Sequence, residues 1–411
     1  MDEAVEAQGT PPSVEPVDVR FRGLDGLRAF AVLMVISHNY GPFPGLTRFG
    51  KYSWLTAGYV GVTLFFVLSG FLITQRLIAE HRSSGSVSLV AFWKRRAYRL
   101  LPALLLCLLL LAIQNIRTHT DLGETVRAAL SALFYVFNLV SAQRPPANPL
   151  GGEGWGALWS LSVEEQFYVL WPAPLLFAWK RFSHSKTLVI TLTLTAASAS
   201  WATVLWWRGA SFSRLYLATD TRAQSLFLGA ALAIVWHGYP KVRDFFQRTA
   251  RFLPVACGGL LLFAVFGSSA LPTARPGWML GPGLFVVSAW CGFLCVGVTE
   301  ASPAAWISRV LNNKVAVAIG QRSYGLYLFH VVSAVFLRNA QGGWLLSLAL
   351  TFAIAWASYA YVEQPIMRWH AARARLRCTP TTQTPPASPT TSTTPTTASG
   401  SSASSVFPGA R

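Results

Sequence analysis

The chain has 411 residues, of which 53% are hydrophobic and only 12% are charged, and its formal net charge at pH 7 is +18. Soluble domains carry about 25% charged residues, so this composition excludes an ordinary soluble domain and indicates a polytopic membrane protein. The basic residues lie in short clusters between apolar runs and form no single stripe. This pattern orients membrane proteins and argues against nucleic-acid binding.

Residues 1–20 precede the first apolar run and are polar, acidic and Pro-containing. We expect them to form a disordered lead-in and no signal peptide. Four of the five cysteines lie further along in apolar runs, where Cys packs as a small hydrophobe. Their spacing predicts no metal site.

Eleven apolar runs approach the length of about 20 residues that a membrane-spanning helix needs. They lie at roughly 27–42, 54–78, 100–116, 124–142, 160–179, 187–207, 223–238, 252–270, 278–299, 323–341 and 343–366. From about residue 379 the composition changes to Ser, Thr and Pro, which predicts a disordered tail over 379–411.

The positions of the basic clusters distinguish a fold with ten membrane crossings from one with eleven. If every run crosses, the clusters at 180–181 and 241–251 fall outside the cell, against the positive-inside rule. If 124–142 does not cross, all basic clusters fall inside. We therefore predict an all-α fold with ten spans in the plasma (inner) membrane and both termini in the cytoplasm. The run 124–142 is then a re-entrant or interfacial segment.

The first run, GLDGLRAFAVLMVISHNY (23–40), contains two ionisable residues, Arg28 and His38. Ionisable groups in a span are costly and usually mark function. Arg28 lies at the cytoplasmic end, and His38 lies about 15 Å further along the helix. A neutral imidazole beside an acceptor hydroxyl is a suitable general base. The alternative is a hydrogen-bonded core histidine, and it applies more strongly to His330.

The segment WSLSVEEQFY (159–168) brings two carboxylates into the membrane from the outer side. Ser162 and Glu165 have the spacing of a capping box, which gives Glu165 a structural role. Glu164 shares a face with Tyr168 and needs a cationic partner when it is buried. We expect Glu164 to orient the imidazole of His38.

The segment FWKRRAYRLLP (92–102) opens a helix on the cytoplasmic side with Arg95, Arg96 and Arg99. A plain positive-inside anchor is one interpretation. The other is a phosphate site, because Arg96 and Arg99 are three residues apart and lie on one helix face. Two guanidinium groups there suit a phosphorylated, aromatic-headed ligand such as a nucleotide.

Two later segments carry further ionisable residues. Asp220 and Arg222, in YLATDTRAQSLFLG (216–229), begin a predicted span. They form either a local ion pair, with a cap and a snorkelling Arg, or part of an acceptor site. Glu363, in YVEQP, is expected to pair with an Arg of a loop.

Together with GYVGVTLFFVLSGFLIT (58–74) and SYGLYLFH (323–330), these segments resemble in their order the membrane-bound acyltransferase 3 family of O-acyltransferases, over residues 21–370. The resemblance implies transfer of an acyl group from cytoplasmic acyl-CoA, usually acetyl-CoA, to a hydroxyl of a surface polysaccharide, lipopolysaccharide or peptidoglycan. It implies the following residues: His38, Arg28 and Glu164 in catalysis; Arg95, Arg96 and Arg99 for CoA; and Tyr168, Asp220, Arg222 and His330 as candidates for substrate binding.

The chain also departs from the family pattern. Nine residues separate Arg28 from His38, where the family commonly has ten, and Asn39 occupies the aligned position. Ten steps of 100° leave the two side chains about 80° apart on the helix. Thr63 stands where an Asp is common. A lipid or glycan transporter is the alternative function, although the paired half-repeats typical of transporters are not evident in the sequence.

Overall fold

The computed structural model describes residues 22–40, 55–144, 148–266, 278–302, 305–337, 343–369 and 373. Within these ranges all regular structure is helical, which confirms the all-α class. The predicted lead-in (1–20) and the predicted tail (379–411) lie outside the described residues.

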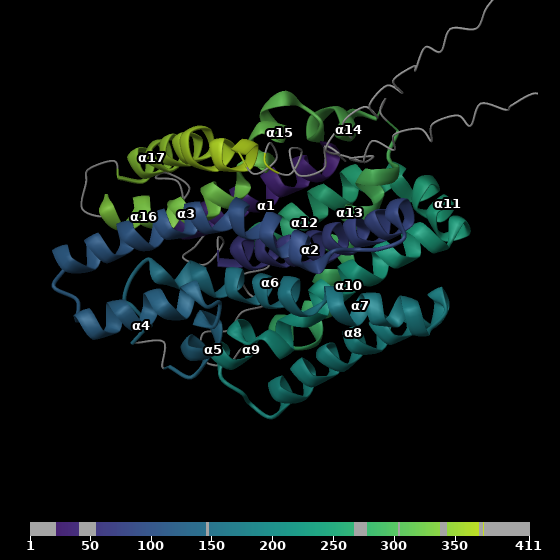
Figure 1. Ribbon diagram of the computed structural model, residues 1–411, viewed down its shortest axis with the longest axis horizontal. Helices are drawn as coiled ribbons and strands as arrows, with labels where there is room; N and C mark the ends of the chain where they lie inside the picture. The colour runs from purple at the N-terminus through teal and green to yellow at the C-terminus, as the bar shows by residue number, and fades with distance from the viewer. Residues whose placement is uncertain are drawn as a thin grey trace, which may run out of the picture. The chain divides into compact units, whose positions relative to one another are not determined.

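The α-helices of Figure 1 are α1 (Arg22–Tyr40), α2 (Leu55–Ser84), α3 (Leu89–Arg117), α4 (Leu122–Leu133), α5 (Phe137–Ala142), α6 (Leu158–Leu170), α7 (Pro172–Arg181), α8 (His184–Trp207), α9 (Phe212–Leu217), α10 (Thr219–Gly238), α11 (Pro240–Thr249), α12 (Leu253–Phe266), α13 (Pro282–Glu300), α14 (Trp306–Leu311), α15 (Lys314–Gln321), α16 (Ser323–Phe336) and α17 (Gly343–Ser358). Single 3-10 turns occur at Trp155–Ala157, Ala250–Phe252 and Trp278–Leu280, and a π-helical turn at Tyr359–Glu363 follows α17.

Five helical stretches of the described chain are long and apolar enough to cross a membrane. They are Gly58–Ser84, Leu89–Arg117, His184–Trp207, Pro282–Glu300 and Gly343–Trp369. The other runs that we predicted to cross the membrane are also helical where the structure describes them. Each coincides with one helix, except the run 160–179, which coincides with the consecutive pair α6 and α7. The structure therefore supports a membrane-spanning helical protein.

The run 124–142 is broken into two short helices. Asp121 caps α4 by accepting a hydrogen bond from the backbone N–H of Glu124 at 2.8 Å. Between α4 and α5, Tyr135 has a φ of 56°, in the left-handed region that breaks a helix. The pieces have 12 and six residues, and neither reaches the length of about 20 residues that a span needs.

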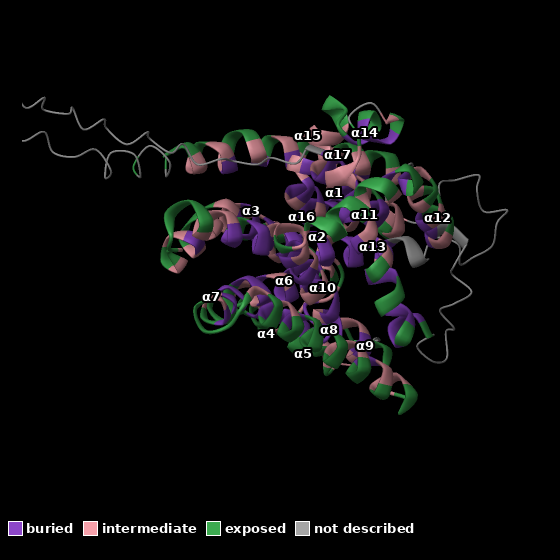
Figure 2. Ribbon diagram, turned by 90° about the vertical axis from the view of Figure 1, so that its right-hand side faces the viewer, coloured by how far each residue is buried: buried purple, intermediate pink, exposed green. Residues whose placement is uncertain are grey.

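The core forms where α2 packs against α1 on one side and α10 on the other. A Cβ atom added to Gly229 of α10 would lie 2.1 Å from the carbonyl oxygen of Val67, so only glycine permits this approach of the two backbones. Figure 2 shows buried residues gathered on the inner helices and exposed residues on the outer ones. The exposed faces include many large apolar side chains, as Leu105, Leu109 and Val189 illustrate, which suits contact with lipid.

Candidate active site

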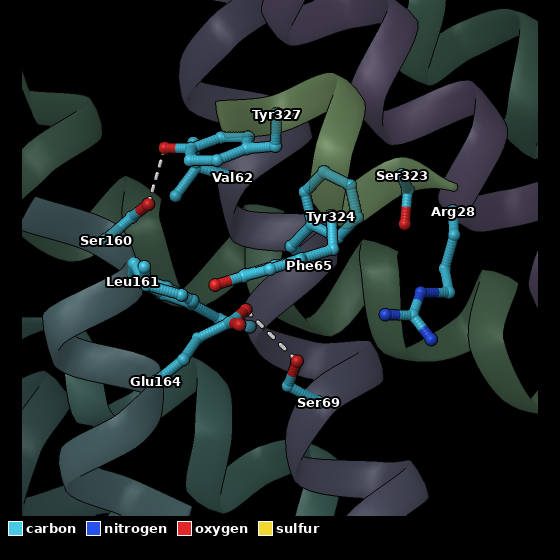
Figure 3. Close-up of a pocket in the computed structure, with 11 residues that line it drawn as sticks. Arg28, Val62, Phe65, Ser69, Ser160, Leu161, Glu164, Ser323, Tyr324 and Tyr327 are labelled. Atoms are coloured by element: carbon cyan, nitrogen blue, oxygen red, sulfur yellow. Dashed lines mark hydrogen bonds between the residues drawn. The ribbon is translucent and has the colours of Figure 1, made fainter. Parts of the chain in front are cut away.

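A pocket of about 50 Å³ lies among α1, α2, α6 and α16. Arg28 lines it, and Ser69 donates a hydrogen bond to Glu164 at 3.0 Å nearby. Further along, Ser160 and Tyr327 face each other with their hydroxyl oxygens 2.5 Å apart. Figure 3 shows Arg28 beside Ser323 at one side of the pocket and the Ser160–Tyr327 pair at the other. The pocket lining therefore combines hydroxyl groups with the charged side chains of Arg28 and Glu164.

The half-buried side chain of His38 lies just beyond this pocket. α1 and α2 run in opposite directions, because Gly61 faces Ala31 and Gly58 faces His38. A Cβ atom on Gly58 would lie 2.5 Å from Cδ2 of His38, so the imidazole lies directly against the α2 backbone. Val62 lines the pocket, and Gly58 is only one turn, about 6 Å, away from it. The pocket thus extends from Arg28 toward His38.

The structure does not bring Glu164 to His38, which differs from the prediction. Glu164 is bonded to Ser69, whereas His38 faces Gly58. These two positions are eleven residues apart on α2, about 16 Å along the helix. Glu164 lies instead in the same pocket as Arg28, with which it interacts electrostatically. The prediction was wrong because it estimated depth from the ends of the runs and not from their packing.

The prediction of a capping box at Ser162 and Glu165 was also wrong. α6 begins at Leu158, so Ser162 lies inside the helix and its hydroxyl donates to the Leu158 carbonyl at 3.1 Å. Glu165 instead receives two hydrogen bonds from Arg96, at 2.9 and 3.3 Å. The Arg96 guanidinium also lies over the ring of Tyr168, 3.2 Å from its centroid. Arg96, Glu165 and Tyr168 therefore form one buried unit.

The three predicted CoA-binding arginines separate into different surroundings. Arg95 is exposed and pairs with Glu80 at 3.0 Å. Arg99 lies within electrostatic range of three other guanidinium groups, those of Arg28, Arg76 and Arg96, and of one carboxylate, that of Glu363. Positive charge in excess of negative charge is the mark of an anion site.

Sequence reasoning missed Arg76. It lies two turns after Ser69 on α2, and residues seven apart share a helix face. Once Ser69 is recognised as a pocket residue, this spacing identifies Arg76. The sequence alone gave no sign that Ser69 faces a site.

His330 is fully buried, and both of its ring nitrogens have partners. Nδ1 lies 2.5 Å from the carbonyl oxygen of Tyr327, which can only accept, so Nδ1 carries the proton. Nε2 then accepts from the amide of Asn39 at 3.1 Å. Asn39 also donates to the Val35 carbonyl. These bonds give His330 the character of a structural core histidine.

Asp220 and Arg222 do not pair with each other. Asp220 accepts hydrogen bonds from Arg214 and from Trp201. Arg222 does not snorkel: it is fully buried, and it donates to Thr63 Oγ1 at 3.3 Å.

Glu363 is buried and accepts a hydrogen bond from Ser358 at 3.4 Å. Its electrostatic partners are Arg99 and Arg322. Within the described residues, no three His, Cys, Asp or Glu side chains lie together in an arrangement that could hold a metal ion.

Several known proteins resemble this chain. The peptidoglycan O-acetyltransferase OatA of Listeria monocytogenes serovar 1/2a is 33% identical over 372 residues, which cover 84% of this chain and 55% of the relative. The O-acetyltransferase OatA of Staphylococcus aureus strain NCTC 8325 is 32% identical over 357 residues, covering 84% and 57%. The chain thus spans a little over half the length of these relatives. No solved structure matches it with statistical significance.

The family comparison agrees with the resemblance found in the motifs. A profile described as an acyltransferase domain (Acyl_transf_3) matches residues 21–362, nearly the whole described helical part. The chain belongs to the acyltransferase 3 family.

Proposed function

We propose that this protein is a membrane O-acyltransferase that moves an acyl group, in the first instance acetyl, from cytoplasmic acyl-CoA to a hydroxyl group of a glycan. The observation that carries the proposal is the pocket that Arg28 lines and that extends along α2 toward His38. An enzyme that joins a charged donor on one side of a membrane to an acceptor on the other needs such a path.

The donor binds first at the arginine cluster. Arg28, Arg76 and Arg99 hold the phosphate groups of CoA, because guanidinium groups form strong paired hydrogen bonds with phosphate. Arg95 has only a peripheral place, since it is exposed and already pairs with Glu80. The pantetheine arm then extends through the pocket past Ser69 and Ser160. About 15 Å of helix separates Arg28 from His38, a distance that an extended pantetheine arm covers.

His38 acts at the thioester. Its neutral imidazole takes the proton from the acceptor hydroxyl as that oxygen attacks the thioester carbonyl carbon. The new C–O bond replaces the C–S bond, and the departing CoA sulfur receives the proton from His38. In the covalent alternative, His38 takes the acyl group first and passes it to the acceptor in a second step.

The acceptor class follows from the relatives. One relative is named a peptidoglycan O-acetyltransferase, and we propose a glycan of the cell envelope as the acceptor here. Ten spans with both termini in the cytoplasm place the outer end of α1, and with it His38, on the side from which such a glycan arrives. The break between α4 and α5 supports this number of spans.

The test is transfer of label from radioactive acetyl-CoA to peptidoglycan glycan strands by the purified full chain in lipid vesicles. We expect label that alkali releases, as an O-acetyl ester requires. Strands whose hydroxyl groups have been methylated are the matched control and should stay unlabelled. Absence of ester label in a preparation that binds acetyl-CoA contradicts the proposal, and movement of unlabelled glycan across the vesicle would then favour a transporter.

A further inference from the structure

Arg222 is a fully buried cation whose hydrogen-bonding capacity is largely unused. Its Nη2 donates to Thr63 Oγ1 at 3.3 Å. Its Nε and Nη1 are buried and have no hydrogen-bond partner within the described part of the chain. A buried donor without a partner is destabilising, and more so when it is charged. The site therefore favours a ligand that accepts these hydrogen bonds.

The surroundings of Arg222 are aromatic. Its guanidinium lies 5.1 to 5.6 Å from the ring centroids of Tyr216, Phe66 and Trp159. Such rings stabilise a cation, but they accept no conventional hydrogen bond at Nε or Nη1. They hold the guanidinium in place and leave these two donors to another group.

Two of the rings that contact Arg222 line hollows of the protein. Phe66 lines the pocket that contains Arg28 and Glu164. Trp159 lines a second pocket of about 120 Å³, together with Ser213 and Leu217 on α9. In the proposed topology this second pocket opens on the outer side.

Arg222 also lies close to the catalytic histidine. The ring of Tyr216, which contacts Arg222, is 4.5 Å from that of Tyr59. The Tyr59 ring is in turn 5.8 Å from that of His38. These ring contacts connect Arg222 to His38, so an acceptor of more than one sugar unit can reach both side chains.

We propose that Arg222 recognises an oxyanion of the acceptor, a carboxylate or a phosphate, and so selects acidic glycans. The anion enters from the pocket beside Trp159 and accepts a charge-assisted hydrogen bond from one of the unpartnered donors, Nε or Nη1. The second oxygen of a carboxylate or phosphate then faces Nη2, which lies next to both of these nitrogens. The inference rests on the proposed acyl transfer, and it adds the acceptor's charge as the feature that is recognised.

The test compares three acceptors in the labelled-acetyl assay. They are the disaccharide of N-acetylglucosamine and N-acetylmuramic acid with its lactyl carboxylate, the methyl ester of that carboxylate, and the methyl ester carrying a 1-phosphate. We expect the KM for the neutral ester to exceed that of the preferred anionic acceptor by about tenfold or more, from loss of a charge-assisted hydrogen bond. The preferred acceptor identifies the oxyanion as carboxylate or phosphate.

Thr63→Asp supplies an internal counter-ion, because Thr63 already contacts Arg222. This variant should remain folded, with an unchanged or raised thermal midpoint, and should lose the preference for the anionic acceptor while still acetylating the neutral ester. Thr63→Asn is the matched neutral control and should retain the preference. Neither variant removes the buried Arg222, and the thermal midpoint of each variant distinguishes a folding failure from a changed preference.

Equal KM values for all three acceptors in the wild-type protein overturn the inference, and so does an unchanged anion preference in Thr63→Asp. Both results leave acyl transfer itself intact. Acetylation of none of the acceptors, by contrast, contradicts the proposed function, so the two failures are distinguishable.

Discussion

His38 and His330 differ in where they lie relative to the pocket. The two nitrogens of His330 are occupied by the Tyr327 carbonyl and by Asn39, so removing a proton from a substrate would first require breaking one of these bonds. His38 lies against Gly58 and is half-buried, about one helical turn beyond Val62 of the pocket. We therefore propose His38, and not His330, as the base.

Arg99 and Arg95 provide a matched pair for the donor site. Arg99→Gln removes a charge from the cluster with Arg28 and Arg76, and we expect acetyl-CoA to bind about tenfold or more weakly, as for a lost charge-assisted hydrogen bond. Arg95→Gln removes an exposed charge that pairs with Glu80, and such pairs contribute about 0–1 kcal/mol. Calorimetric titration of both variants with acetyl-CoA measures the difference. Equal affinities would indicate that the segment 92–102 serves only as a membrane anchor.

At the scale of elements, α2 organises the molecule. Gly58 allows α1 to bring His38 against it, Ser69 holds Glu164 from α6, and Val67 meets Gly229 from α10. The same helix therefore fixes both ends of the pocket. Changes that shift α2 are expected to impair the site even when no site residue is altered.

Gly229→Ala tests this packing. The added methyl group would lie 2.1 Å from the Val67 carbonyl oxygen, so α2 and α10 must separate. We expect a loss of about 1–3 kcal/mol in stability, as for an overpacked core, seen as a lower thermal midpoint in detergent. Gly258→Ala on α12 is the control, because no atom lies within 4 Å of its added Cβ. Similar melting of the two variants would show that the α2–α10 approach tolerates displacement.

At the scale of the whole molecule, the sequence predicted helix positions better than contacts between helices. Hydropathy located the helices because each apolar run is a local property of the chain. The prediction that 124–142 does not cross the membrane came only from the distribution of basic residues, since 124–142 reads as one apolar run. The break at Tyr135 itself was not predicted. Neither hydropathy nor the distribution of charge predicts the partners of Glu164 and Glu165. Ser69 and Arg96 come from other helices, and a single sequence contains no signal for such contacts.

The proposed topology can be tested independently of activity. A reporter fused after residue 150 should read as external, and one fused after residue 185 as cytoplasmic, because α6 and α7 then form one crossing between them. The basic pair at 180–181 is the physical reason for the cytoplasmic assignment. A cytoplasmic signal at residue 150 would indicate eleven crossings. The pocket beside Trp159 would then lie on the cytoplasmic side.

The most direct test of the central proposal is the rate of acetyl transfer by His38→Ala and by His330→Gln, at matched protein amounts and with acetyl-CoA binding measured in parallel. The account predicts that His38→Ala still binds acetyl-CoA but loses at least about 10² in transfer rate, the contribution of a general base. His330→Gln should keep transfer activity, with a lower thermal midpoint because its hydrogen bonds are altered. An active His38→Ala together with a folded but inactive His330→Gln would contradict the account and assign the chemistry to His330.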